Sequence, residues 1–199
     1  MEAPSVGAAP FATLGPMTGE RTDEELMLAY ARDDLRAFDQ LYARNRGPLY
    51  RFLLRSAGNR ASADELFQET WVRVIGARQR YRPEARFSTW LLSIAHRLLI
   101  DQSRRARPLS GTEAAELALA QEPAPEHESP EATHSAFALA RRVQAALAEL
   151  PAEQREAFLM RAEFDAGPDE IAQATGVGRE TAKSRLRYAV ERLRQRLSP

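Results

Sequence analysis

Apolar residues recur every three to four positions along most of this chain, and no segment sustains the alternation typical of a half-buried strand. This spacing places apolar side chains on one face of a helix. The pattern begins at Asp23 and includes Leu26, Phe38, Leu41 and Leu49. It continues through residues 63–81, 87–107, 134–150, 152–164, 168–175 and 179–197. We therefore predict an all-α protein without strands.

Composition divides the chain into two helical domains. Residues 108–135 hold four prolines and six glutamates but no lysine or arginine, which is typical of a linker. If fully extended, this linker would reach about 90 Å, although the sequence also allows a short helix around EAAELALAQ. Residues 1–22 are rich in Ala, Pro and Gly without periodicity, which predicts a disordered tail. The predicted domains are residues 23–107 and 136–199.

Several residues mark the expected helix ends. Thr22 and Glu25 have the spacing of a capping box, and either Asn59 or Ser62 is suited to begin the next helix. The segment RPEAR interrupts the pattern, because Pro83 is incompatible with a helix interior. Gly176 suits a turn with positive φ between the last two helices.

Charge is segregated although the formal net charge is +0. From Val72 to Arg107 there are nine arginines against Glu84 and Asp101, and the last 22 residues before Ser198 carry seven basic side chains. A neutral sum argues against a protein that coats nucleic acid indiscriminately, but it leaves room for local basic surfaces.

Other classes of protein lack support in the sequence. With no cysteine there is no disulfide, thiol nucleophile or thiolate metal site. The three histidines (His96, His127 and His134) lack metal-ligand spacing, and there is no Gly-rich phosphate loop. No signal peptide and no apolar run of membrane-spanning length occur. We expect no enzyme activity, no cofactor or metal, no membrane insertion and a cytoplasmic location.

The C-terminal segment has the form of a helix-turn-helix. Residues 168–175 and 179–197 are predicted helices separated by Gly-Val-Gly, and five apolar residues are spaced to pack them together: Ile171, Ala172, Val177, Ala182 and Leu186. A basic, solvated surface helix is the alternative interpretation. The turn, the apolar pattern and the charge together favour DNA contact by the second helix, through Arg179, Thr181, Lys183, Ser184, Arg185, Arg187 and Tyr188.

The N-terminal domain contains a more specific pattern. An acidic helix carries Asp64, Glu65, Leu66, Gln68, Glu69 and Trp71; a basic-aromatic break follows at Arg80, Tyr81 and Phe87; and the next helix carries Trp90, Leu91, Ile94, Ala95, Asp101, Arg104 and Arg105. This arrangement resembles that of bacterial sigma factors, in particular the extracytoplasmic-function (ECF) group, and residues from Leu150 onward resemble the family's region four. The two matches cover nearly everything outside the tail and linker.

The resemblance implies a transcription initiation factor with regions two and four joined directly by the linker. Such a factor binds core RNA polymerase and directs the polymerase to promoter DNA. The promoter duplex is then opened. It also implies a regulatory partner, an anti-sigma factor, which is often membrane-anchored and would then hold the protein at the membrane.

The resemblance also assigns candidate site residues. Core-polymerase binding falls to Asp64, Glu65, Gln68 and Glu69, whose charge would complement a basic partner. Binding of the opened minus-ten element falls to Arg80, Tyr81, Arg82, Arg86, Phe87, Trp90, Arg97, Arg104 and Arg105, a mixture that can stack on bases and hold a single strand. The Tyr81–Phe87 break is a candidate pocket for a flipped base, although Phe87 and Trp90 suit a core equally well. The helix-turn-helix residues are assigned to the minus-thirty-five element.

Some positions depart from the family pattern. The family often has Asn at the position of Arg97, and Glu180-Thr181-Ala182 replaces a Gly-Thr-Val form, so the resemblance does not extend to promoter preference. Two other functions remain as alternatives: a dimeric helix-turn-helix regulator with an N-terminal sensor, and a scaffold that contacts only protein. Interleaved arginines and aromatics beside an acidic helix favour the sigma factor, because a sensor domain does not require them.

Overall fold

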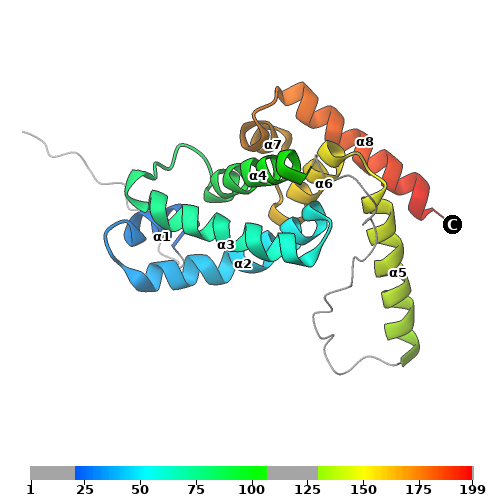
Figure 1. Ribbon diagram of the computed structural model, residues 1–199, viewed down its shortest axis with the longest axis horizontal. Helices are drawn as coiled ribbons and strands as arrows, with labels where there is room; N and C mark the ends of the chain where they lie inside the picture. The colour runs from blue at the N-terminus through cyan, green and yellow to red at the C-terminus, as the bar shows by residue number, and fades with distance from the viewer. Residues whose placement is uncertain (1–20, 107–129, 199) are drawn as a thin grey trace, which may run out of the picture.

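The computed structural model describes residues 21–106 and 130–198, which form eight α-helices, one 3₁₀ turn and no strand (Figure 1). This confirms the all-α prediction. The elements are α1 (Asp23–Tyr30), α2 (Leu35–Ala57), α3 (Arg60–Ala77), η1 (Arg78–Arg80), α4 (Phe87–Ala106), α5 (Pro130–Ala148), α6 (Ala152–Phe164), α7 (Pro168–Thr175) and α8 (Arg179–Leu197). The predicted tail up to residue 20 and the segment EAAELALAQ lie outside the described residues.

Side-chain caps define the helices of the N-terminal helical group, α1–α4 with η1. Thr22 and Glu25 form the predicted capping box at α1, and Asn59 accepts a hydrogen bond from the Ser62 N–H at α3. Asp34 caps α2 in the same way, so the periodic stretch from residue 23 to 57 forms two helices rather than one. Asp33, with φ 68°, makes the turn between them.

Aromatic packing centres the core of this group on Trp71. Its ring centre lies 4.8 Å from that of Tyr42 and 5.9 Å from that of Phe38. On α3, Val74 is buried, as its apolar spacing predicts, but Val72 and Ile75 are 61% and 42% exposed. Those two residues lie on the outer face of the helix, so not every apolar residue of this segment packs in the core.

Glu24 ties α1 to the beginning of α4. Its carboxylate accepts a hydrogen bond of 2.5 Å from the backbone N–H of Phe87, one of the donors left without a partner at a helix N-terminus. Burial alone would raise the pKa of Glu24, but this bond, further hydrogen bonds and nearby Arg86 lower it below its ordinary value of 4.5. The loop that precedes α4 is thereby anchored on α1.

We expect Glu24→Gln to destabilise the protein by about 1 kcal/mol at neutral pH, because a charge-assisted bond is lost. A carboxylate with a lowered folded-state pKa stabilises the fold above its ordinary pKa, and this contribution disappears as the pH falls through the folded-state value. The difference between wild type and variant in urea unfolding should therefore shrink at acidic pH. Glu84→Gln, in the exposed loop before α4, is the control, and equal effects of the two variants would contradict the role of Glu24.

The C-terminal helical group comprises α5–α8. Helix α8 packs against α5, α6 and α7. Helix α5 begins at Pro130, inside the segment predicted to be linker, so helix already covers the last six residues of that segment.

The predicted helix-turn-helix is present in α7 and α8. Pro168 occupies the first turn of α7, and Gly176 ends that helix with φ 70°, as its sequence position predicts. Ile171, Ala172 and Ala182 are buried where the two helices meet. Val177 and Leu186 are partly buried against the same core, so the predicted packing set is confirmed.

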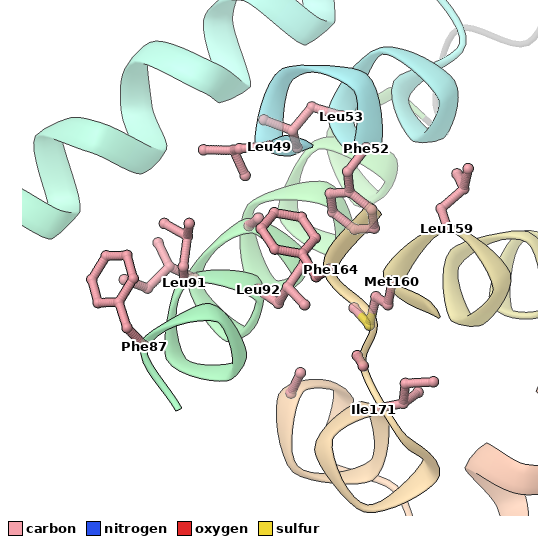
Figure 2. Close-up of a cluster of buried hydrophobic side chains, with 14 of the residues drawn as sticks. Leu49, Phe52, Leu53, Phe87, Leu91, Leu92, Leu159, Met160, Phe164 and Ile171 are labelled. Atoms are coloured by element: carbon pink, nitrogen blue, oxygen red, sulfur yellow. The ribbon is translucent and has the colours of Figure 1, made fainter. Parts of the chain in front are cut away.

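The two helical groups pack directly on each other. Helix α6 lies against α2, and α7 lies against α4 (Figure 1). Figure 2 shows Phe52 of α2, Leu92 of α4, and Phe164 and Met160 of α6 gathered in one cluster, with Ile171 of α7 beside them. A single hydrophobic core therefore runs through both groups, although the sequence suggests two separate domains.

Candidate nucleic-acid and polymerase interfaces

Helix α8 presents a basic face to solvent. Arg179 and Lys183 are more than 60% exposed, and Arg187 is also exposed. The Arg187 guanidinium lies 4.8 Å from the ring centre of Tyr188, which is itself half exposed. Because the buried Ala182 and Ala189 fix the opposite face in the core, this surface is held rigidly outward. It has the shape and charge of a helix that enters a major groove.

Two of the predicted residues on α8 differ in their surroundings. Arg179 forms an ion pair of 2.6 Å with Asp169 of α7, which links the beginnings of the two helices. Arg185 is half-buried and lines a cavity of about 450 Å³ between the helical groups, together with His96 and Leu99 of α4. The structure therefore separates Arg185 from the outward basic face.

The break before α4 places its arginines outside and its aromatic rings inside. Arg80, Arg82 and Arg86 are exposed, as predicted for a surface that contacts nucleic acid. Tyr81 and Phe87 are 3% and 0% exposed and pack against each other with ring centres 6.2 Å apart. Burial, with a smaller contribution from Glu24 and Asp23, raises the pKa of Tyr81 to about 12. Neither ring has a free face on which a base can stack, so the predicted pocket for a flipped base is not formed.

Trp90 is the aromatic ring that remains partly accessible at this site. It is half-buried, with its ring centre 4.9 Å from that of Tyr81. Trp90, Arg97 and Arg104 follow one another at intervals of seven residues, which places them along one face of α4. This row joins the exposed arginines of the loop to the far end of the helix.

The predicted minus-ten residues do not form one cluster. Arg86 and Arg105 stand at opposite ends of α4, and 19 positions at 1.5 Å each separate them by about 28 Å. Arg105 instead lines a groove between α3 and α4. The structure therefore places it beside the acidic residues of α3, away from the loop.

The acidic helix α3 faces this groove. Three of the four predicted residues (Glu65, Gln68 and Glu69) line it with Val72 and Arg105, in a volume of about 680 Å³. Asp64 lies on the adjoining flank, where its carboxylate accepts a hydrogen bond of 2.7 Å from the Tyr50 hydroxyl. That bond is the main reason why the pKa of Tyr50 is raised. The exposed Val72 and Ile75 adjoin the acidic side chains, and together they offer a surface with both charge and apolar area.

Comparison with known proteins identifies the family. A family model for Sigma-70 region 2 matches residues 41–108, and one for Sigma-70, region 4 matches residues 140–193. The chain is 32% identical over 162 residues to the RNA polymerase sigma factor CarQ of Myxococcus xanthus. The aligned residues make up 81% of this chain and 89% of the relative. It is 30% identical over 190 residues to the ECF RNA polymerase sigma factor SigM of Mycobacterium tuberculosis, 96% of this chain and 91% of the relative.

The chain is an ECF sigma factor of the sigma-70 family. Sigma factors of this family are transcription factors rather than enzymes. The sigma factor binds core RNA polymerase and directs it to specific promoters, where region 2 reads and melts the minus-ten element and region 4 reads the minus-thirty-five element.

Two solved structures share the fold of this sigma factor. CnrH in complex with the cytosolic domain of CnrY aligns with a TM-score of 0.62 at 22% identity and covers 87% of this chain and 95% of that one. The sigma factor RpoE in complex with the anti-sigma factor NepR from Bartonella quintana aligns with a TM-score of 0.65 at 22% identity, over 80% and 96% of the two chains.

Sequence patterns did not indicate the residues that hold the two regions of the sigma factor together. Glu163 of α6, His96 of α4 and Glu170 of α7 all bridge from one helical group to the other. Each stands singly among helical residues, and no spacing pattern marks a contact between segments more than 50 residues apart. Among the residues that the structure describes there is no cluster of potential metal ligands, and no helix there is long and apolar enough to cross a membrane.

Proposed function

We propose which residues of this sigma factor bind core polymerase and which bind each promoter element. Residues 23–107 act as region 2 and residues 136–199 as region 4. The groove face of α3, with Glu65, Gln68 and Glu69 and the adjoining Asp64, binds core polymerase. The observation that supports this proposal best is the presence of this acidic and apolar groove on the same chain as the outward basic face of α8.

The minus-ten element is contacted by the exposed part of the predicted set. The arginines of the loop and of the α4 row hold the backbone of the separated DNA strand, and Trp90 provides a surface on which a base can stack. These arginines are Arg80, Arg82, Arg86, Arg97 and Arg104. Tyr81 and Phe87 support the loop from within. Arg105 contributes charge at the far end of α4, beside the polymerase groove.

The minus-thirty-five element is contacted by α8. Arg179, Lys183 and Arg187 carry exposed positive charge, and Thr181, Ser184 and Tyr188 add hydrogen-bonding groups on the same helix. Arg185 reaches DNA only if its side chain leaves the cavity between the helical groups. The sigma factor acts without a cofactor or an enzymatic reaction of its own, and it works in the cytoplasm.

An anti-sigma factor is proposed as the regulatory partner. Both structural neighbours share the fold at low identity, and the RpoE neighbour was solved with the anti-sigma factor NepR. A membrane-anchored anti-sigma factor would hold this chain at the membrane.

In vitro transcription tests the proposed function. Purified core polymerase from the source bacterium, supplied with this sigma factor and fragments of the source genome, should initiate at discrete start sites. No initiation above core enzyme alone would contradict the proposal. The comparisons do not support a stand-alone dimeric regulator, which would instead bind duplex DNA tightly in the absence of polymerase.

We expect Arg187→Ala to weaken binding of the holoenzyme to such promoters. The slope of log affinity against log salt concentration should become smaller in magnitude by about 1, as expected for the loss of one phosphate contact. Fluorescence anisotropy over a salt series measures both quantities. The matched control is Arg192→Ala, because Arg192 lies on α8 but lines a small cavity beside α5. Equal loss in the two variants would indicate a general charge effect instead of a contact by the outward face.

A further inference from the structure

The cavity that Arg185 lines has the size of a small-molecule site. Its volume of about 450 Å³ falls within the range of roughly 300–1,000 Å³ that is typical of ligand pockets, which occur preferentially where two domains meet. Its walls come from the second half of α4, the first turn of α6, the turn after α7, and α8 (Figure 1). The cavity is separate from the groove between α3 and α4 that is proposed to bind polymerase.

Two arginine side chains line the cavity without a paired carboxylate. Arg155 of α6 is half-buried, and its Nη1 atom donates a long hydrogen bond of 3.4 Å to the carbonyl oxygen of Ala148. Burial lowers the pKa of Arg155 below its ordinary value, against the opposing effect of Glu156. Arg185 is also half-buried, and within residues 21–106 and 130–198 no carboxylate forms an ion pair with it. Because a partly buried guanidinium without a counter-charge is costly, an anion between these residues would be stabilised.

Two glutamates also line the cavity, and their positions limit how far they neutralise the arginines. The Glu156 carboxylate lies 2.6 Å from Nδ1 of His96, which is its partner across the contact between the helical groups. Glu153 is exposed in the first turn of α6, where water screens its charge. The half-buried positive charge of Arg155 and Arg185 therefore remains available to a bound anion.

Hydrogen-bond donors surround the same space. No side chain caps α6, so the backbone N–H groups of its first turn, among them those of Ala152 and Glu153 at the cavity, lack the acceptor that a cap would supply. The positive end of a helix dipole favours an anion at this position. The Ser56 hydroxyl oxygen, which belongs to the same lining, is buried and has no hydrogen-bond partner among the described residues. Buried polar atoms without a partner are uncommon, and a bound oxyanion would supply one.

The rest of the lining is apolar. Leu99 and Ile100 of α4 and Val177 of the turn after α7 contribute side chains to the cavity. An inorganic phosphate ion would use the arginines but leave these side chains without contact. The lining therefore suits a molecule that combines an anionic group with an apolar body.

We infer that this cavity binds a small organic anion, whose carboxylate or phosphate lies against Arg155 and Arg185 and whose apolar body lies against Leu99, Ile100 and Val177. The lining belongs to both helical groups, so a bound anion contacts regions 2 and 4 at once and stabilises the folded chain by mass action. The inference does not depend on which residues of the sigma factor contact polymerase or DNA.

Isothermal titration of the full free chain with four small probes tests this inference. Phenyl phosphate and phenylacetate carry both an anionic group and an apolar ring, whereas benzyl alcohol lacks the charge and inorganic phosphate lacks the ring. We expect one site per chain for the two aromatic anions, with affinity about tenfold or more above that for either control. The tighter of the two aromatic anions distinguishes a phosphate site from a carboxylate site. Failure of both to bind, or equal affinity for all four probes, would overturn the inference.

Arginine variants on α8 test where the anion lies. Arg185→Gln should weaken binding of the tighter aromatic anion by about fivefold or more, because one charge-assisted contact is lost. Arg192→Gln is the matched control, since Arg192 is exposed on the same helix and lines the small cavity beside α5 instead. Its affinity should stay within about twofold of the wild type. Equal losses in the two variants would show a general attraction of anions to a basic helix and would overturn the site.

A variant at the first turn of α6 separates anion binding from folding. Ala152 is exposed at the first position of α6, where an acidic side chain favours the helix. Ala152→Asp should therefore keep or raise the melting temperature while it weakens binding of the aromatic anion by about tenfold. Ala152→Asn has the same shape without the charge and should keep its affinity within about threefold of the wild type. Unchanged binding by Ala152→Asp would place the anion elsewhere and overturn the inference, whatever the outcome of the transcription experiment.

Discussion

Phe87→Ala is expected to destabilise region 2 by about 3–5 kcal/mol, a large part of the stability of a domain of this size. The ring is 0% exposed and begins α4, where it packs against Tyr81 and Trp90 at ring-centre distances of 6.2 and 5.7 Å. Truncation removes apolar contact and leaves a cavity beneath the loop that carries Arg82 and Arg86. Urea unfolding followed by circular dichroism measures the loss.

The matched variant Phe87→Leu distinguishes a core role from a stacking role. Leucine keeps most of the buried volume, so the fold should lose less than about 1.5 kcal/mol. If Phe87 belongs to the core, this variant should open promoters nearly as well as the wild type, as measured by permanganate reactivity of unpaired thymines. A folded Phe87→Leu factor that fails to open promoters would restore the sequence-based prediction that the ring stacks on a base.

Glu69→Lys should reduce assembly with core polymerase by at least tenfold. Glu69 lines the groove between α3 and α4, about half of its side chain is exposed, and it forms an ion pair of 2.9 Å with Arg73. Charge reversal removes that pair and places two cations side by side where a basic partner is expected. Titration of labelled factor with core enzyme measures the change in affinity.

The fold itself should tolerate this change, because exposed ion pairs contribute little to stability. Asp39→Lys reverses the same charge on the exposed face of α2 and is expected to leave polymerase binding within about twofold of the wild type. Normal assembly of Glu69→Lys with core polymerase would remove the α3 groove from the polymerase interface. Equal loss in both variants would indicate a long-range charge effect.

Local features of the fold followed from the sequence because they depend on neighbours in the chain. The capping box at Thr22, the turn at Gly176 and the packing of Ile171 and Ala182 all arise from residues within a few positions of one another. Helical periodicity predicted which segments are helices for the same reason. The exposed positions of Arg80, Arg82 and Arg187 followed from charge, since an unpaired guanidinium is costly to bury.

The sequence by itself determined that the chain is all-α, that it ends in a helix-turn-helix and that it carries the sigma-factor pattern. These properties depend on residue type and on the spacing of residues that are close together in the chain. Only the tertiary structure decided that Tyr81 and Phe87 are core residues, that Val72 and Ile75 are exposed, and that Arg86 pairs with Glu170. Periodicity shows that a helix has an apolar face but not what covers it. The side-chain pairs between the two regions join residues 60 to 112 positions apart, so the contact depends on how complete helices fit together.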